Sequence, residues 1–193
     1  MGQIDYAVVQ QAVLGESTSG DACLVLESPG QVLVAVIDGL GHGRDAHEAA
    51  LAALACIRAN ESSPLDTLLM RCHEALRHTR GAVIAVSRID RQQHQLIHAG
   101  IGNIETRIIG AERTYHPVSI NGIAGHSVRK IRSEIFPFHP GDLLVMHSDG
   151  ISERFELSPL ARERDIQFLA SQLVHAHGRH HDDQLLLILR ETP

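Results

Sequence analysis

The stretch that decides the fold reads VLVAVIDGLGHG and covers residues 32–43. Its first part, Val32–Ile37, is a nearly continuous apolar run, which is typical of a strand buried on both faces. Its second part starts at Asp38 and contains three glycines, whose backbone can come close to a ligand. Arg44–Asn60 follows with small apolar residues near a 3.6-residue spacing. We therefore expect a buried strand, a glycine turn and a helix that packs closely on a sheet.

The remaining sequence predicts runs of strands with helices grouped between them. One further helix is expected from Pro64 to about His78, with Ser63 as its N-cap, and another over Ser158–His177. The predicted strands, besides Val32–Ile37, cover Tyr6–Leu14, Ala22–Glu27, Ala82–Ile89, Gln95–Ala99, Glu105–Ile109, Arg113–Pro117, Arg129–Phe138, Leu143–His147 and Gln184–Leu189. This order favours an α+β sandwich of mostly antiparallel sheets covered by helices over a parallel, doubly wound sheet. Residues 1–193 are expected to form one domain.

Composition narrows the class of protein. The chain has 193 residues, and its 44% hydrophobic content is sufficient for a sizeable core. A formal net charge of -6 argues against a nucleic-acid partner, because phosphate binding needs basic patches. No apolar run approaches the roughly 20 residues needed to cross a bilayer, and the N-terminus lacks the features of a secretory signal. Cys23, Cys56 and Cys72 lack CxxC spacing, which favours reduced thiols in a cytoplasmic protein.

Short acidic motifs lie at the ends of several apolar runs. Aspartate is a poor strand residue, and an ionised carboxylate is costly to bury unless it is paired or binds a metal. Carboxylates brought together would repel each other, and a hard divalent cation with oxygen ligands removes that repulsion. The sequence therefore predicts a magnesium or manganese site built from four motifs: Ser19-Gly20-Asp21, Asp38-Gly39, Ser148-Asp149-Gly150 and Asp182-Asp183.

Other interpretations of these motifs fit the sequence less well. The glycine turn is a candidate phosphate loop, but no lysine follows it as in GxxxxGK[ST], and it does not complete GxGxxG. His180-His181 beside Asp182 suggests zinc or di-iron, but the chain lacks HExxH and paired Cys/His spacing. A phosphodiesterase or nuclease is disfavoured by the acidic balance. Each acidic motif alone is also an ordinary turn, so the prediction depends on the combined set.

The ordered motif set resembles the metal-dependent PPM (type 2C) serine/threonine protein phosphatases. Within that family it is most similar to the compact bacterial branch that includes SpoIIE, RsbU and RsbX. A mid-chain stretch, Ala99-Gly100-Ile101-Gly102-Asn103, is similar to the AGxG-type turn of this branch. The resemblance spans residues 6–190 and leaves no room for a sensor domain, which makes the chain most like the stand-alone stressosome phosphatase RsbX.

The resemblance implies an αββα sandwich with two Mn²⁺ or Mg²⁺ ions at one end of the sheets. By motif matching, Asp38 bridges both ions and the carbonyl of Gly39 completes the first, with Asp21 on the same side. Asp149 and Asp182 hold the second ion. A metal-bridging hydroxide then attacks phosphorus in line, so no covalent intermediate is needed. The resemblance implies that Asp183 either contacts these ligands without binding the two ions or binds a third ion.

Two positions depart from the larger members of the family. They carry a histidine directly after Asp-Gly, where this chain has Leu40, so His42 becomes the candidate general acid. They also carry a phosphate-binding arginine near the N-terminus, whereas this chain has no Arg or Lys before Arg44. The implied function is dephosphorylation of phosphoserine or phosphothreonine on stressosome regulators with STAS domains, by a monomeric enzyme. The alternative is a catalytically weak regulatory or binding module on the same fold.

Overall fold

The computed structural model describes residues 2–155 and 165–192. The helices within these ranges are α1 (Arg44–Ala59), α2 (Leu65–Ala75) and α3 (Ile166–His177). Its strands are β1 (Ile4–Gln11), β2 (Asp21–Ser28), β3 (Gln31–Gly39), β4 (Ala82–Asp90), β5 (Gln95–Ile101), β6 (Glu105–Ile109), β7 (Thr114–Tyr115), β8 (Gly122–Ile123), β9 (Ser127–Val128), β10 (Glu134–Pro137), β11 (Leu143–His147) and β12 (Gln184–Glu191).

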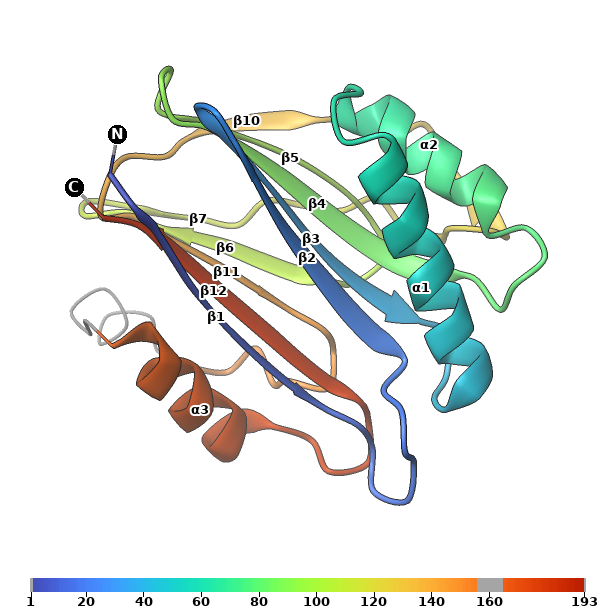
Figure 1. The fold of residues 1–193 in the computed structure, drawn as a ribbon. Helices are drawn as coiled ribbons and strands as arrows, with labels where there is room; N and C mark the ends of the chain where they lie inside the picture. Colours follow the sequence, from blue (N-terminus) through green and yellow to red (C-terminus); the bar gives the residue numbers. More distant parts are fainter. Residues whose placement is uncertain (1, 156–164, 193) are drawn as a thin grey trace.

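The elements form four layers, which Figure 1 shows from the side. One sheet has the strand order β10-β5-β4-β3-β2, and α1 and α2 cover its outer face. The second sheet has the order β1-β12-β11-β6-β7, and α3 covers its outer face. The strand pairs within both sheets are antiparallel. The predicted αββα sandwich is therefore confirmed.

Strand β3 is buried on both faces, as its sequence predicted. Its odd and even positions belong to different cores because successive side chains point to opposite faces of a sheet. Leu33, Ala35 and Ile37 pack in the core beneath α1 and α2. Val32, Val34 and Val36 pack between the two sheets. A third core, which includes Leu169 and Leu173, lies between the second sheet and α3.

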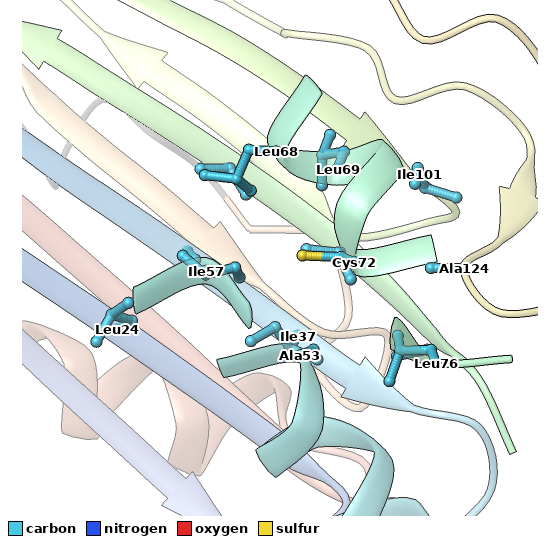
Figure 2. Packing of buried hydrophobic residues seen from close by; sticks show 14 of the residues in the cluster. Leu24, Ile37, Ala53, Ile57, Leu68, Leu69, Cys72, Leu76, Ile101 and Ala124 are labelled. Carbon is cyan, nitrogen blue, oxygen red and sulfur yellow. The ribbon is translucent and has the colours of Figure 1, made fainter. Parts of the chain in front are cut away.

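The helix-side core explains the small residues of α1. Ala53 and Ile57 are fully buried, and in Figure 2 they lie next to Leu24 and Ile37 of the sheet. The start of α2 differs from the sequence prediction: the helix begins at Leu65, and its N-cap is Pro64. The hydroxyl of Ser63 instead accepts a hydrogen bond from Arg71 at 3.1 Å. The helix ends at Ala75, short of the predicted His78.

Several other boundaries differ from the prediction. β1 ends at Gln11 rather than Leu14, and the expected strands over 113–117 and 129–138 shrink to the short strands β7 and β10. The predicted start of the third helix, Ser158, lies outside the described residues. The described part of this helix follows Asp165, whose carboxylate accepts a hydrogen bond from the Phe168 amide at 2.9 Å. No helix in the described ranges is long and apolar enough to cross a membrane.

The antiparallel pairing brings four strand ends to one end of the sandwich. β2 begins where its partner β3 ends, and β12 begins where its partner β11 ends. At the opposite end of the sandwich the two chain ends lie side by side, with Ile4 paired to Glu191 and the Thr192 amide donating to the Gln3 carbonyl. The acidic motifs flank the four strand ends, so both sheets contribute to one site.

Candidate metal centre

Asp21 and Asp38 are contributed by the first sheet, which contains β2 and β3. Asp21 is the first residue of β2, and Asp38 is the last residue but one of β3. The two residues are directly opposite each other in the antiparallel register, which places their side chains on the same face of the sheet. Their carboxylates therefore lie near each other at the end of the sandwich.

Asp149 and Asp182 are contributed by the second sheet. Asp149 follows β11 by two residues, and Asp182 precedes β12 by two residues. Both line one open pocket of about 170 Å³, together with Asp38 of the first sheet. The other lining residues are Leu40, Gly41, Val83 and Asn103. The structure thus brings three of the predicted metal ligands to one surface.

Larger pockets lie elsewhere on the molecule. One of about 290 Å³ lies by the β2–β3 turn, and one of about 580 Å³ lies by the β6–β7 turn. Neither is lined by any of the predicted aspartates of the acidic motifs. Ion binding depends on convergent oxygen ligands rather than on volume, so the acidic pocket is the better candidate for the site.

Asp21 lies below the pocket surface and is only 1% exposed. The hydroxyl of Ser148 donates to Oδ2 of Asp21 at 2.6 Å. The same hydroxyl accepts a hydrogen bond from the Leu185 amide at 3.0 Å. Ser148 thereby connects β2 to β12 and satisfies one oxygen of a carboxylate that would otherwise be buried without a donor.

Asp183 is buried, and both of its oxygens accept backbone hydrogen bonds. Oδ1 accepts from the Val13 amide at 2.8 Å, and Oδ2 accepts from the Gly20 amide at 2.7 Å. Its carboxylate therefore fixes the loop between β1 and β2, which leads into Asp21. Gly39 has a structural reason to be glycine, because a Cβ atom there would lie 2.1 Å from the Ala46 carbonyl of α1. The helix can approach this end of β3 only without a side chain.

Burial and mutual repulsion raise the pKa values of several carboxyl groups at the site. Burial raises the pKa of Asp38 to about 8, and the neighbouring carboxylate of Asp21 adds to the rise. Burial likewise raises the pKa of Asp21 to about 7, although the Ser148 hydrogen bond opposes the rise. The pKa of Asp182 is also raised, first by burial and then by Asp149. Without a cation, Asp21 and Asp38 therefore ionise less readily than an ordinary aspartate.

The donor set fits a hard divalent cation in its chemistry. The ligands available are carboxylate and carbonyl oxygens, which Mg²⁺ and Mn²⁺ prefer over nitrogen or sulfur. As they stand, no three His, Cys, Asp or Glu side chains within 2–155 and 165–192 are close enough to hold one ion. Repelling carboxylates would move closer together around a positive charge.

His42, the candidate general acid, and Arg80, which the sequence did not single out, both lie outside the lining of the acidic pocket. His42 does not line the acidic pocket, and its Nδ1 lies 3.0 Å from Oε1 of Glu16. Arg80 forms an ion pair with Asp45 at 3.2 Å, and a Cβ atom built on Gly41 would lie 2.9 Å from its guanidinium group. A positive charge is therefore held directly against a glycine of the pocket wall.

Comparison with known proteins agrees with this geometry. A family model described as Stage II sporulation protein E (SpoIIE) matches residues 28–192. The chain belongs to the SpoIIE family. The predicted resemblance to the PPM phosphatases, and to their SpoIIE branch, is thereby confirmed.

Individual relatives of this SpoIIE-family chain cover nearly its whole length. The phosphoserine phosphatase RsbX of Bacillus subtilis is 23% identical over 171 residues, which are 88% of this chain and 86% of RsbX. A solved structure of RsbX with magnesium has a TM-score of 0.89 at 22% identity and covers all of both chains. A structure from work on the bacterial stressosome, a modular system adapted to control secondary messenger signalling, has a TM-score of 0.94 at 34% identity. It covers 97% of this chain and 100% of that one.

Proposed function

We propose that the chain is a metal-dependent protein phosphatase that hydrolyses phosphoserine or phosphothreonine on stress-response regulators with STAS domains. The observation that carries this proposal is the meeting of Asp38, Asp149 and Asp182 in one pocket, supplied by both sheets. Membership of the SpoIIE family and the likeness to RsbX, itself a phosphoserine phosphatase, support the reaction class. The 34% identical structure from the stressosome study supports the regulatory setting.

Each acidic residue has a part in this proposal. Asp38 would bridge two Mn²⁺ or Mg²⁺ ions, with Asp21 and the Gly39 carbonyl serving one ion and Asp149 and Asp182 the other. When bound, such ions activate water and offset the negative charge that develops on the phosphoryl oxygens. The protein groups supply the fixed oxygen ligands, and the pocket wall orients the phosphorylated side chain.

Asp183 has a supporting part rather than a place around a third ion. Both of its oxygens already accept hydrogen bonds from backbone amides, which hold the β1–β2 loop in place.

The shape of the pocket also indicates which kind of substrate it can admit. It is small and open, and Leu40 beside it is 43% exposed. Such a site suits a phosphorylated side chain on the surface of a folded protein better than an enclosed small molecule.

A phosphatase assay with controlled metal tests the proposal. The protein is treated with EDTA and given a STAS-domain protein that carries phosphoserine, and Mn²⁺ or Mg²⁺ is then added in excess. We expect phosphate release only with added metal, and a loss of about 100-fold or more in Asp38→Asn. Asp5→Asn, an exposed change on β1, serves as the matched control and should retain full turnover.

Two outcomes would count against this function. Full metal-dependent turnover by Asp38→Asn would remove the proposed role of the acidic pocket. Tight Mn²⁺ binding by the wild-type protein without any turnover would favour the alternative, a catalytically weak binding module on the same fold.

A further inference from the structure

The sequence AGIGN, residues 99–103, ends strand β5 and leads to the acidic pocket. Ala99 and Ile101 are fully buried in the core beneath α1 and α2, and Figure 2 shows Ile101 there. Asn103 is exposed and lines the pocket beside Asp149. Core packing therefore explains the apolar residues of this stretch but not its asparagine.

The two glycines of this stretch fix the path of the turn. Gly102 has a φ of 100°, and a Cβ atom there would lie 2.1 Å from the Val83 side chain. A Cβ atom on Gly100 would lie 2.0 Å from the Ser119 hydroxyl. Ile120 braces both glycines, because its carbonyl accepts from the Gly102 amide at 2.8 Å and its amide donates to the Gly100 carbonyl at 3.0 Å. Asn103 therefore projects from a rigid turn.

The Asn103 side chain contacts one of the proposed metal ligands. Its Nδ2 donates a hydrogen bond to Oδ2 of Asp149 at 3.0 Å. Asn103 lies in the link from β5 of the first sheet to β6 of the second, and Asp149 follows β11, the neighbour of β6. The bond therefore lies just beyond the β6–β11 pair, where His147 is opposite Glu105. A neutral amide offers this donor without adding a positive charge that would compete with a bound cation. A donor bound to one carboxylate oxygen sets the direction of the other.

We propose that Asn103 is a positioning residue that holds Asp149 in the orientation needed to bind a divalent cation. This inference rests on the proposed function, because it takes Asp149 as a metal ligand. The glycines of AGIGN are then required to aim the amide, and the buried residues anchor the turn. Loss of a hydrogen-bond partner behind a metal ligand commonly costs about 10- to 100-fold in metal affinity or activity.

Calorimetric titration with Mn²⁺ tests the proposal without relying on turnover. Asn103→Leu keeps the branched shape of the side chain but removes the donor, and we expect its dissociation constant for Mn²⁺ to rise about 10-fold or more. Asn103→Gln keeps an amide and should recover part of the affinity. Asn121→Leu is the matched control, since Asn121 is an exposed asparagine in a neighbouring loop, and its affinity should equal that of the wild type.

A double substitution separates positioning from general damage to the fold. With Asp149→Asn as the background, Asn103→Leu should cause no further loss of Mn²⁺ affinity, because the ligand it orients is gone. Wild-type affinity in Asn103→Leu would overturn the inference, as would equal losses in the two backgrounds. If the wild type binds Mn²⁺ without turnover, the proposed function fails while the affinities still decide this inference. If the wild type binds no Mn²⁺, both fail.

Discussion

Asp21 and Asp38 are directly opposite each other in the antiparallel β2–β3 pair. Like charges in this relationship destabilise a sheet, by up to about 1 kcal/mol at ordinary positions. Here burial adds to the cost and raises the pKa values of both carboxyl groups to about 7 and about 8. The pair is thus unfavourable for the fold alone, which is expected where residues are retained for binding a cation.

Replacing one member of the pair should stabilise the metal-free protein. In Asp38→Asn the opposing charge is gone, so we expect the free energy of unfolding in EDTA at pH 8 to rise by about 1 kcal/mol. Urea denaturation followed by circular dichroism measures this change. Asp5→Asn should leave the value within about 0.5 kcal/mol of the wild type. A lower stability of Asp38→Asn would show that the carboxylate pair is not strained.

The same pair predicts how stability depends on pH. The pKa of Asp38 is about 8 in the folded protein against an ordinary value of 3.8 for aspartate, so between these values the folded state binds more protons than the unfolded state. The metal-free protein should therefore lose stability as pH rises from about 4 to about 8. Thermal unfolding in EDTA across this range measures the effect.

Added Mn²⁺ should reverse this loss, and more strongly at pH 8 than at pH 6, because the cation binds the ionised carboxylates. Melting curves at both pH values, with and without Mn²⁺, supply the comparison. A melting temperature in EDTA that climbs between pH 6 and pH 8 would contradict the assignment.

Ser148→Ala should weaken both the fold and the site. The change removes the donor to Asp21 and the acceptor of the Leu185 amide, both of which are buried. Leaving buried polar groups without partners costs about 1–3 kcal/mol, so urea denaturation should show a loss of that size. Ser62→Ala, at an exposed serine, is the control and should show little change. Equal stability of the two variants would be inconsistent with the bridging role of Ser148.

His42→Gln should leave catalysis nearly unchanged. Its ring faces Glu16 rather than the acidic pocket, so it is not positioned to protonate a leaving group. We expect kcat on the phosphorylated STAS-domain protein to stay within about 3-fold of the wild type, with the same pH profile. A general acid typically contributes about 10²- to 10⁴-fold. A loss of that size, with one limb of the pH profile missing, would restore His42 as the acid.

Arg80→Ala should weaken substrate binding more than turnover. The guanidinium group does not line the acidic pocket but lies against Gly41 of its wall, and we expect it to attract an incoming phosphoryl dianion from there. Because the side chain is half exposed, we expect KM to rise only about 3- to 10-fold while kcat changes little. Arg77→Ala, which removes an exposed arginine paired with Glu74, should not alter KM. Identical KM values for both variants would exclude the contact.

The central elements of the fold could be predicted because their periodicity is strong. Val32–Ile37 is apolar at every position, and both of its faces are indeed buried. Helix boundaries were less predictable, since they depend on tertiary contacts. Ser63 precedes a proline, as an N-cap residue often does. Its hydroxyl instead accepts a hydrogen bond from Arg71, and the helix starts at Leu65. The polar stretches around β7 and β10 lie at sheet edges, where few contacts define a strand.

The aspartates that meet at the candidate site could be singled out from the sequence, but the residues that contact them could not. Each aspartate lies at a strand end, which the sequence reveals. The contact Ser148–Asp21 joins residues 127 positions apart on different sheets, so it depends on how the two sheets are stacked. The contact Asn103–Asp149 joins residues 46 positions apart and depends on the register of β6 with β11. Ser148 and Asn103 lie within motifs that the sequence analysis names, but nothing else in the sequence indicates that they contact the aspartates. Arg80 lies in no motif.

The two ends of the chain meet beside β1 and β12, at the end of the sandwich opposite the carboxylates. A fluorescent label or an affinity tag attached at either end would stay clear of an approaching phosphoprotein. The same adjacency makes the chain a good candidate for circular permutation, in which a short peptide joins the old ends and new ones open in a distant turn.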